Sequence, residues 1–458
     1  MLKILFQILS ANALVLGIKL VSGFLFPGCM STQAYADYQT FSLYLSYLPI
    51  LSLGFPAGLF VRYGGQRFDR LDKARYKSET RLLAGILLVF SGLFMVIWAF
   101  RPGRMLLYIT LCIFPYCLVC SYQSLYQTWG DFSKSNRTQL LAAAVPVLGS
   151  FALLLLSGHL EADSFILLFL GIHWLLAFRI LVRNARATAG VQTLRLLDET
   201  NLETWKTGIS ICVGSYIHVV IHSLDKQIVN LVFDSSDFAR YSFALSLQSV
   251  VMLFITALSQ PMYHFLAKEE ISRDGYPVLM RSLLMLGAWG GIAYYGCVWI
   301  VSWLLPNYVP SLEIVAVYFL VFPPMAVIQG LYVNLYKLHG QARRYVIRSL
   351  GVLVLSLVLN LLLILWRKEL WVVAAATVSV YYIWFLADSG VFRHVGFSAK
   401  DGLFLAGTIV MYLLSLKLAP QFLGAVVCAV SLGLVCVALY RREATAAFRY
   451  LFQKRSRT

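Results

Sequence analysis

Charged side chains are scarce in this chain, and acidic ones are the scarcest. Only 13% of the 458 residues are charged, with 21 Asp and Glu against 38 Lys and Arg, while 60% of the residues are hydrophobic. This composition lies far outside the range of soluble globular proteins. It excludes an ordinary water-soluble domain and indicates a membrane protein.

The chain also lacks the motifs of the common enzyme classes. It contains no Walker motif, no G-x-S-x-G, no H-E-x-x-H and no pair of carboxylates placed for acid–base catalysis. The acidic residues Asp198, Glu199 and Glu203 lie beside Arg195 and Lys206, which is typical of a solvated connector. We therefore predict no enzymatic activity and no cofactor.

Cysteine pairs are missing from the predicted outer connections, although the chain has eight cysteines. Cys117 and Cys120 have a C-x-x-C spacing and follow Cys112, but all three lie in an apolar stretch without a nearby histidine. This pattern favours small residues of a membrane-embedded core over a metal or redox site.

Long apolar stretches make up most of the sequence. A bilayer core of ~30 Å needs about 20 apolar residues per helix. Fourteen stretches of roughly this length follow one another along the chain, and they predict an all-α, polytopic membrane protein. The predicted spans are 4–26, 38–61, 82–100, 106–123, 140–156, 165–182, 208–233, 238–266, 278–305, 312–336, 345–365, 370–392, 403–418 and 423–440.

Lys and Arg are concentrated in alternate connections between these spans. Thirty of the 38 fall on one side and five on the other; the remaining three, Lys19, Lys226 and Arg240, lie within spans or at their edges. Because positive residues stay in the cytoplasm, both termini are predicted to be cytoplasmic. The net charge of +17 then reflects topology and contact with anionic lipids, and we expect no binding of nucleic acid.

The outer connections predicted from this topology are short. The segments 27–37, 157–164, 234–237 and 306–311 leave no room for a large extracytoplasmic loop. Polytopic glycan polymerases and ligases generally carry their reacting groups on such a loop. Their mechanism is therefore disfavoured, although this class remains an alternative.

Two halves of the sequence resemble each other. YADY at 35–38 opens the second span and FARY at 238–241 opens the eighth, at an offset of 203 residues. At the same offset Lys19 falls on His222, and Pro56 falls two residues before Pro261. Each half holds six spans, so the copies share one orientation and predict a pseudo-two-fold axis along the membrane normal. The predicted parts are an N-terminal six-helix lobe 1–182, a cytoplasmic linker 183–207, a C-terminal six-helix lobe 208–392, and two additional helices with a basic tail 393–458.

Two segments resemble a known family. SGFLFPGCMSTQAYADYQTFSLYLSYLPILSLGFPAGLFVRYGG at 22–65 resembles the opening of the polysaccharide (O-antigen or exopolysaccharide repeat-unit) flippases of the multidrug/oligosaccharidyl-lipid/polysaccharide exporter superfamily. HSLDKQIVNLVFDSSDFARYSFALSL at 222–247 resembles their second signature. The resemblance implies a two-lobed transporter in the bacterial cytoplasmic membrane that moves undecaprenyl-pyrophosphate-linked oligosaccharide from the inner to the outer leaflet. The spans hold few acidic residues, which leaves proton or sodium open as the coupling ion.

Ionisable residues within the spans are the candidate site, because such groups are costly in a bilayer unless they face water or a partner. His218, His222 and Lys226 recur at i, i+4 and i+8 and form one stripe, which Asp225 adjoins. With Lys19 of the first span, this stripe is predicted to line a central cavity. The alternatives are interfacial snorkelling of Lys19, a structural pair of Asp225 with Lys226, and hydrogen-bonded interior histidines.

Three further residues have weaker signals. Arg62 follows the second span and marks either the cytoplasmic interface or the mouth of the cavity. Arg240 is expected to pair with Asp234 or Asp237 at the start of the eighth span, and Asp388 is expected to be a surface group near Arg393. Within transporters, an ion-coupled drug or metabolite antiporter is the alternative function, but such a cavity is usually apolar or acidic.

Overall fold

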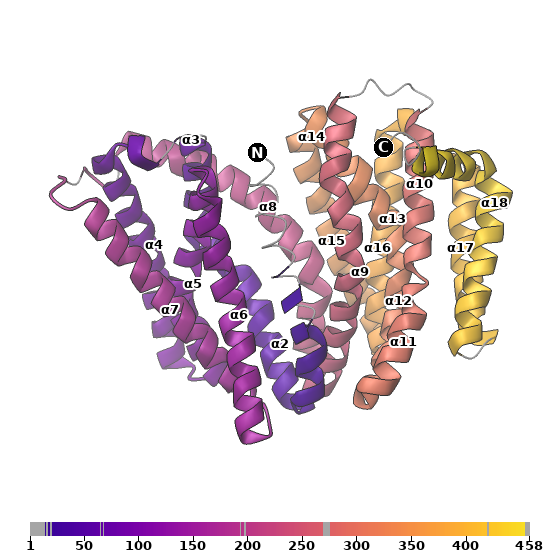
Figure 1. Cartoon of the computed structure of the whole chain (residues 1–458), viewed down its shortest axis with the longest axis horizontal. Coiled ribbons are helices and arrows are strands. Elements are labelled where there is room, and N and C mark those ends of the chain that lie inside the picture. The colour runs from indigo at the N-terminus through magenta and orange to yellow at the C-terminus, as the bar shows by residue number, and fades with distance from the viewer. Residues whose placement is uncertain are drawn as a thin grey trace. The chain divides into compact units, whose positions relative to one another are not determined.

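The computed structural model describes residues 14, 17–18, 21–64, 66, 68–192, 194–196, 198–268, 275–418 and 421–453. For some of these residues only the backbone is described, namely 253–254, 256–261, 263–265, 267–268, 342, 418, 421–422 and 442–453. The described backbone is helical with short connections (Figure 1). Its β-type pairing is limited to an isolated bridge between Met30 and Leu160. The predicted all-α class is confirmed.

The predicted spans that lie within the described residues are also present as helices. Among the described residues, eleven helices are long and apolar enough to cross a membrane, or twelve if one bent helix pair is a single span. The predicted eighth span coincides with α9 (Ser235–Lys268). The predicted first span falls partly outside the described residues, and Lys19 with it. These helices make the chain a multi-pass membrane protein.

The chain folds into two compact units, and α8 and α9 each contribute to both. The N-terminal unit is Met1–Ser223 with Asp234–Ala239, and the C-terminal unit is Leu224–Phe233 with Arg240–Thr458. The N-terminal unit contains α2 (Thr32–Tyr47), η1 (Leu48–Ser52), α3 (Phe55–Tyr63), η2 (Phe68–Arg70), α4 (Lys73–Phe100), α5 (Arg104–Thr128), α6 (Phe132–Ser157), α7 (Ala162–Ala187) and most of α8 (Glu199–Val232).

The C-terminal unit begins with the end of α8 and most of α9. Its tenth predicted span is a run of short helices in which Pro323 and Pro324 precede a π-helical turn, η5. The further elements are α10 (Gly275–Gly290), α11 (Ala293–Leu304), η3 (Pro306–Tyr308), α12 (Ser311–Tyr318), η4 (Phe319–Val321), α13 (Phe322–Val327), η5 (Ile328–Tyr332), α14 (Val333–Leu338), α15 (Ala342–Trp366), α16 (Leu370–Val391), η6 (Arg393–Val395), α17 (Ala399–Leu418) and α18 (Gln421–Gln453).

Side chains of Ser and Asp fix where several helices begin. The Ser31 hydroxyl accepts a hydrogen bond from the backbone N–H of Ala34 at the start of α2. The Asp234 carboxylate accepts one from the N–H of Asp237 at the start of α9. These caps satisfy backbone donors that a helix end leaves unpaired. Ser31 and Asp234 are 203 residues apart, the offset that relates the two sequence copies.

Several helices extend beyond the apolar stretches that predict them. Helix α4 begins at Lys73 rather than at 82, and α8 begins at Glu199 rather than at 208. The boundaries predicted for these spans are therefore wrong. Hydropathy marks only the part of a helix in contact with hydrocarbon, whereas the polar first turns continue the same helix into the aqueous phase.

The second predicted span is broken. After η1 the chain turns at Leu53 and Gly54, which both have positive φ values, 49° and 75°. Helix α3 then starts with Pro56 in its first turn and is bent by 61° from the preceding helix. Among the described non-glycine residues only Leu53 has a positive φ, so the break is a locally strained feature.

Helices α3 and α8 approach each other closely through two glycines. A Cβ atom at Gly208 would lie 2.1 Å from the carbonyl oxygen of Gly54, and one at Gly58 would lie 2.0 Å from that of Thr204. Such distances are shorter than any van der Waals contact. The indole N–H of Trp205 also donates to the carbonyl of Leu53, at 3.0 Å. Glycine is thus required for this contact.

The substitution Gly208→Ala is expected to destabilise the protein by about 1–3 kcal/mol, because the new methyl group forces α3 and α8 apart. Gly92→Ala is the matched control: it lies within α4 and nothing is within 4 Å of its Cβ position. That change is expected to be neutral or slightly stabilising. Thermal unfolding of both variants in detergent measures the difference; equal melting temperatures would contradict the close contact.

The last two helices of the C-terminal unit pack against α10 and α11. The Asp401 carboxylate, on α17, accepts hydrogen bonds from Arg281 Nε at 2.8 Å, the Tyr440 hydroxyl at 2.6 Å and the Ser398 hydroxyl at 2.7 Å. The Tyr295 hydroxyl donates to Ser415 at 2.7 Å. These bonds fix α17 and α18 to the preceding helices.

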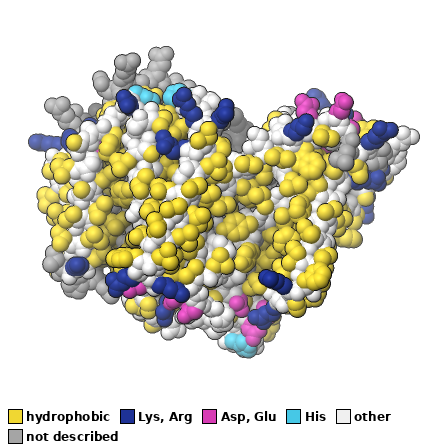
Figure 2. Space-filling model, turned by 180° about the vertical axis from the view of Figure 1, so that it is seen from behind, with side chains coloured by type: hydrophobic (Ala, Val, Ile, Leu, Met, Phe, Trp, Pro, Cys, Tyr) yellow, Lys and Arg dark blue, Asp and Glu magenta, His cyan; other side chains and the backbone are white. Residues whose placement is uncertain are grey.

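Hydrophobic side chains cover the middle of the helices on the face shown in Figure 2, and most charged side chains lie near helix ends. Helices α6 and α15 are examples, with Leu155 and Leu156 on α6 and Leu362 and Leu365 on α15 all more than half exposed. Large exposed apolar surface of this kind is expected where a protein faces lipid.

Candidate functional site

The predicted histidine stripe lies on α8. The rings of His218 and His222 are 6.2 Å apart between centroids and inclined by 30° to each other. His222 is exposed and His218 is half-buried. The two histidines therefore share a face of the helix, as the i, i+4 spacing predicts.

Asp225, three residues further on, is buried in a polar cluster of the C-terminal unit. Its carboxylate accepts hydrogen bonds from the hydroxyl of Tyr241 on α9, at 2.9 Å, and from that of Thr377 on α16, at 3.5 Å. The Tyr241 hydroxyl also contacts that of Tyr318 on α12, at 3.1 Å. Asp225 thus connects four helices of this unit, an arrangement that stabilises their packing.

Lys226 and Arg240 both belong to the C-terminal unit and are half-buried. The backbone N–H of Lys226 donates to the Asp225 carboxylate at 2.7 Å. This hydrogen bond joins two adjacent residues of α8. The expected pairing of Arg240 with Asp234 or Asp237 remains a prediction.

Arg62 is bound to a buried carboxylate. Its Nη1 atom lies 3.1 Å from Glu79 Oε1 and donates to the Thr204 hydroxyl at 3.0 Å. The Glu79 side chain is fully buried, and the hydroxyl of Tyr63 donates to its second oxygen. This cluster ties α3 to α4 and α8, so the guanidinium of Arg62 has a structural partner.

A sequence motif, Y-x-x-L-Y-x-x-x-G, occurs once in each unit and was not part of the sequence prediction. It covers 122–130 at the end of α5 and 332–340 at the end of α14, at an offset of 210 residues. The glycines at its end, Gly130 and Gly340, both have positive φ values, 74° and 63°. Only glycine adopts this conformation readily, which explains the residue at each turn.

In the N-terminal unit the first tyrosine of the motif joins a buried polar cluster. The Tyr122 hydroxyl lies 3.3 Å from that of Tyr76 and accepts a hydrogen bond from the Asn184 amide. The Tyr76 hydroxyl donates to the Asn184 carbonyl oxygen at 2.8 Å. This cluster joins α4, α5 and α7 near their ends.

In the C-terminal unit the second tyrosine of the motif binds Asp388. The Tyr336 hydroxyl donates to Asp388 Oδ1 at 2.9 Å, and the indole N–H of Trp384 donates to Oδ2 at 2.9 Å. Arg348 Nε lies 3.3 Å from the same carboxylate, which is 1% exposed. The prediction that Asp388 is a surface group is therefore wrong: its partners on α14 and α15 are distant in sequence and enclose it.

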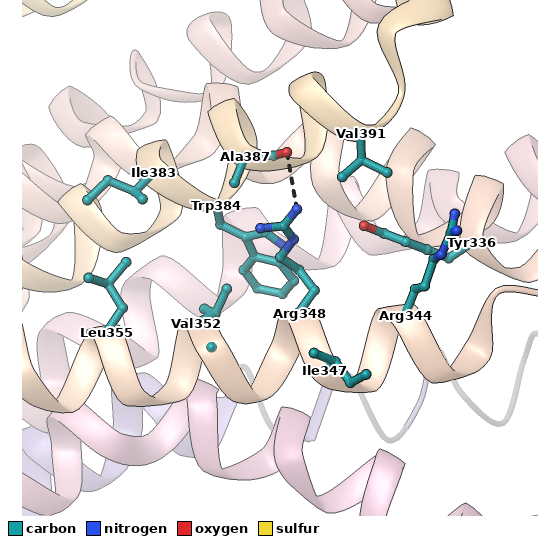
Figure 3. Close-up of a pocket in the computed structure, with 11 residues that line it drawn as sticks. Tyr336, Arg344, Ile347, Arg348, Val352, Leu355, Ile383, Trp384, Ala387 and Val391 are labelled. Atoms are coloured by element: carbon teal, nitrogen blue, oxygen red, sulfur yellow. Dashed lines mark hydrogen bonds between the residues drawn. The ribbon is translucent and has the colours of Figure 1, made fainter.

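A pocket of about 440 Å³ lies beside this carboxylate, between α15 and α16. Figure 3 shows Arg344 and Tyr336 toward one end of it, Arg348 and Trp384 near its middle, and Ile383 and Leu355 at the other end. Arg348 Nη2 donates to the carbonyl of Ala387 at 3.5 Å. Arg348 is thus held by α16, whereas Arg344 makes no ion pair with a described residue.

Replacing Asp388 by alanine is expected to lower stability by about 1–3 kcal/mol, because Tyr336 and Trp384 lose a buried acceptor. Asp388→Asn keeps one acceptor and is expected to lose about half as much. Denaturant unfolding in mixed micelles measures both variants. If neither differs from the wild type, the carboxylate is not a structural partner of these side chains.

A second pocket, of about 350 Å³, opens beside the broken second span in the N-terminal unit. Its walls come from the break at η1 and α3, the second half of α5 and the first half of α8. Apolar side chains alternate there with small hydroxyl and thiol groups, so it can take an uncharged, partly polar group. The lining includes Pro49, Ser52, Phe60, Ser121, Ser124, Cys212 and Tyr216.

Comparison with known proteins identifies a solved structure with a similar fold. No family model matches the chain, and no curated protein matches it in sequence. Among solved structures, the chain is similar to "Lipid II flippase MurJ, inward closed conformation", with a TM-score of 0.65 and 14% sequence identity. The similarity covers 96% of this chain and 99% of that one. This chain therefore has the fold of the lipid II flippase MurJ over almost its entire length.

Proposed function

We propose that this protein is a flippase that moves undecaprenyl-pyrophosphate-linked polysaccharide repeat units from the inner to the outer leaflet of the bacterial cytoplasmic membrane. The observation that carries the proposal is the similarity in fold to a lipid II flippase across both whole chains.

The chemistry of the substrate class supports the same proposal. Sugars and a pyrophosphate cannot cross hydrocarbon unassisted, whereas the apolar polyprenyl tail partitions into the bilayer core. A polytopic protein that provides a polar path for the headgroup, and leaves the tail in the bilayer, meets both needs. We propose that the path opens to each leaflet in turn, by alternating access, with a proton or sodium gradient as the source of direction.

Lys19, Lys226 and Arg62 are proposed to contribute positive charge along the path. A pyrophosphate carries at least two negative charges, and opposed cations are the simplest way to hold it in a low-dielectric environment. Since Arg62 is paired with Glu79, part of its positive charge is already neutralised within the protein.

A strain without the protein tests the proposal. Loss of a flippase leaves single repeat units on carrier lipid facing the cytoplasm, whereas loss of a polymerase or ligase leaves them facing outward. A membrane-impermeant glycosidase added to spheroplasts separates the two. Protected single units are expected; units open to the glycosidase would favour the polymerase or ligase, and normal surface glycan with altered drug resistance would favour the antiporter.

A further inference from the structure

We infer that a basic pocket between α6 and α7 binds the phosphate headgroup of an anionic phospholipid. The pocket has a volume of about 320 Å³ and lies at the end of the N-terminal unit where α6 begins and α7 ends. Its polar lining is made of Tyr126 from α5, Ser133, Lys134, Arg137 and Thr138 from α6, and Arg179 and Arg183 from α7.

The positive charge in this basic pocket exceeds what nearby acids neutralise. Lys134 pairs with Asp131, which itself does not line the pocket. Arg137, Arg179 and Arg183 make no ion pair with a carboxylate of the described chain. Three guanidinium groups with neighbouring hydroxyls form a set of donors suited to a phosphate.

Helix periodicity explains why the cations converge. Arg179 and Arg183 are four residues apart on α7, and Lys134 and Arg137 are three apart on α6, so each pair occupies one face. The guanidinium carbon of Arg183 is 5.2 Å from the ring centroid of Tyr126, within range of a cation–π contact. The ring holds Arg183 near the pocket while leaving its N–H groups available.

The surroundings of the basic pocket favour a lipid over a free anion. Toward the middle of the helices its walls become apolar, with Leu141 and Leu176. Beyond them Leu148 on α6 and Leu175 on α7 are more than 60% exposed. A phospholipid can place its phosphate among the arginines and its acyl chains along these apolar faces. The sequence predicts this end to be cytoplasmic, where anionic lipids give the membrane a negative surface potential.

The internal repeat adds an independent argument. The pocket between α15 and α16 is the counterpart of the basic pocket, because Arg344 matches Lys134 and Tyr336 matches Tyr126 at the offset of 210. A pocket at the same place in each unit fits a lipid of the surrounding bilayer better than a single transported substrate. In the counterpart, Arg348 forms an ion pair with Asp388, which neutralises part of its positive charge. The α6–α7 pocket is therefore expected to bind an anionic headgroup with the higher affinity of the two.

Native mass spectrometry of the delipidated full chain tests this inference with phosphatidylglycerol, phosphatidylcholine and inorganic phosphate as probes. Arg137→Gln with Arg179→Gln is expected to lower the apparent affinity for phosphatidylglycerol about 30-fold, from the attraction that each basic residue contributes near an anionic headgroup. Arg137→Lys with Arg179→Lys keeps the charges and is expected to retain most of the affinity.

The matched control is Arg186→Gln with Arg343→Gln, which removes two exposed arginines that line neither pocket. This control is expected to bind like the wild type. Equal affinity of the Arg137→Gln, Arg179→Gln variant, equal binding of the two phospholipids, or displacement of phosphatidylglycerol by millimolar inorganic phosphate would each overturn the inference. Binding of a polyprenyl-pyrophosphate but not of phosphatidylglycerol would assign the pocket to the transported substrate instead.

Discussion

Lys226→Ala is expected to lower transport of the lipid-linked oligosaccharide at least about tenfold without removing the protein from the membrane. The estimate corresponds to losing about 1.4 kcal/mol of attraction between one cation and a pyrophosphate, a fraction of the Coulomb energy of such a pair at intermediate dielectric. Lys226 is half-buried on α8 and follows a carboxylate that is already bound by Tyr241. We propose that its ammonium group lies close to the anionic headgroup of the substrate during transport.

Complementation of a null strain measures this effect, with membrane levels of each variant followed by immunoblot. Lys226→Arg is expected to restore part of the surface glycan because the charge survives. Lys19→Ala is expected to resemble Lys226→Ala. Asp225→Ala should reduce abundance instead, since Tyr241 and Thr377 lose a buried acceptor. Normal glycan from both lysine variants at normal abundance would show that the cations are interfacial.

Asp401→Ala is expected to destabilise the protein by about 3–5 kcal/mol, the cost of breaking a buried ion pair by removing one partner. The carboxylate is fully buried, while the side chain of Arg281 is 17% exposed. Its removal leaves Arg281 and Tyr440 without their shared acceptor and loosens α17 and α18 from α10.

Denaturant unfolding in mixed micelles measures the loss for Asp401→Ala. Glu369→Gln is the control, because Glu369 pairs with Arg367 at an exposed position between α15 and α16. Exposed pairs of this kind contribute about 0–1 kcal/mol. A loss at Asp401 no larger than that at Glu369 would mean that the last two helices are held by apolar packing alone.

The class of fold and the order of the helices could be predicted from the sequence, because a bilayer imposes length and hydropathy on each span independently of its neighbours. Helix ends could not. The first turns of α4 and α8 are polar, and they are stabilised by contacts such as that of Ser78 with the backbone of Arg195. Such contacts depend on which segments pack against each other, and the hydropathy of a segment does not predict its neighbours.

The partners of the candidate site residues were also beyond the sequence pattern. Asp388 lies 40 residues from Arg348 and 52 from Tyr336, so no sequence pattern near Asp388 indicates that it is buried. Arg62 and Glu79 are closer, but the bend at Leu53 and Gly54 precedes them and sets their geometry. The repeated Y-x-x-L-Y-x-x-x-G motif was accessible to sequence comparison at an offset of 210, and a tyrosine of each copy lies in a buried polar cluster, Tyr122 with Asn184 and Tyr336 with Asp388.

Flipping by the purified chain is the measurement that tests the central claim most directly. Proteoliposomes carrying a polyprenyl-pyrophosphate-linked oligosaccharide in the inner leaflet are mixed with an external glycosidase, in the presence of a proton or a sodium gradient. The account predicts that the wild type exposes the sugar faster than protein-free vesicles and faster than Lys226→Ala. Exposure at the protein-free rate under both gradients, by a chain that is folded and inserted, would contradict it.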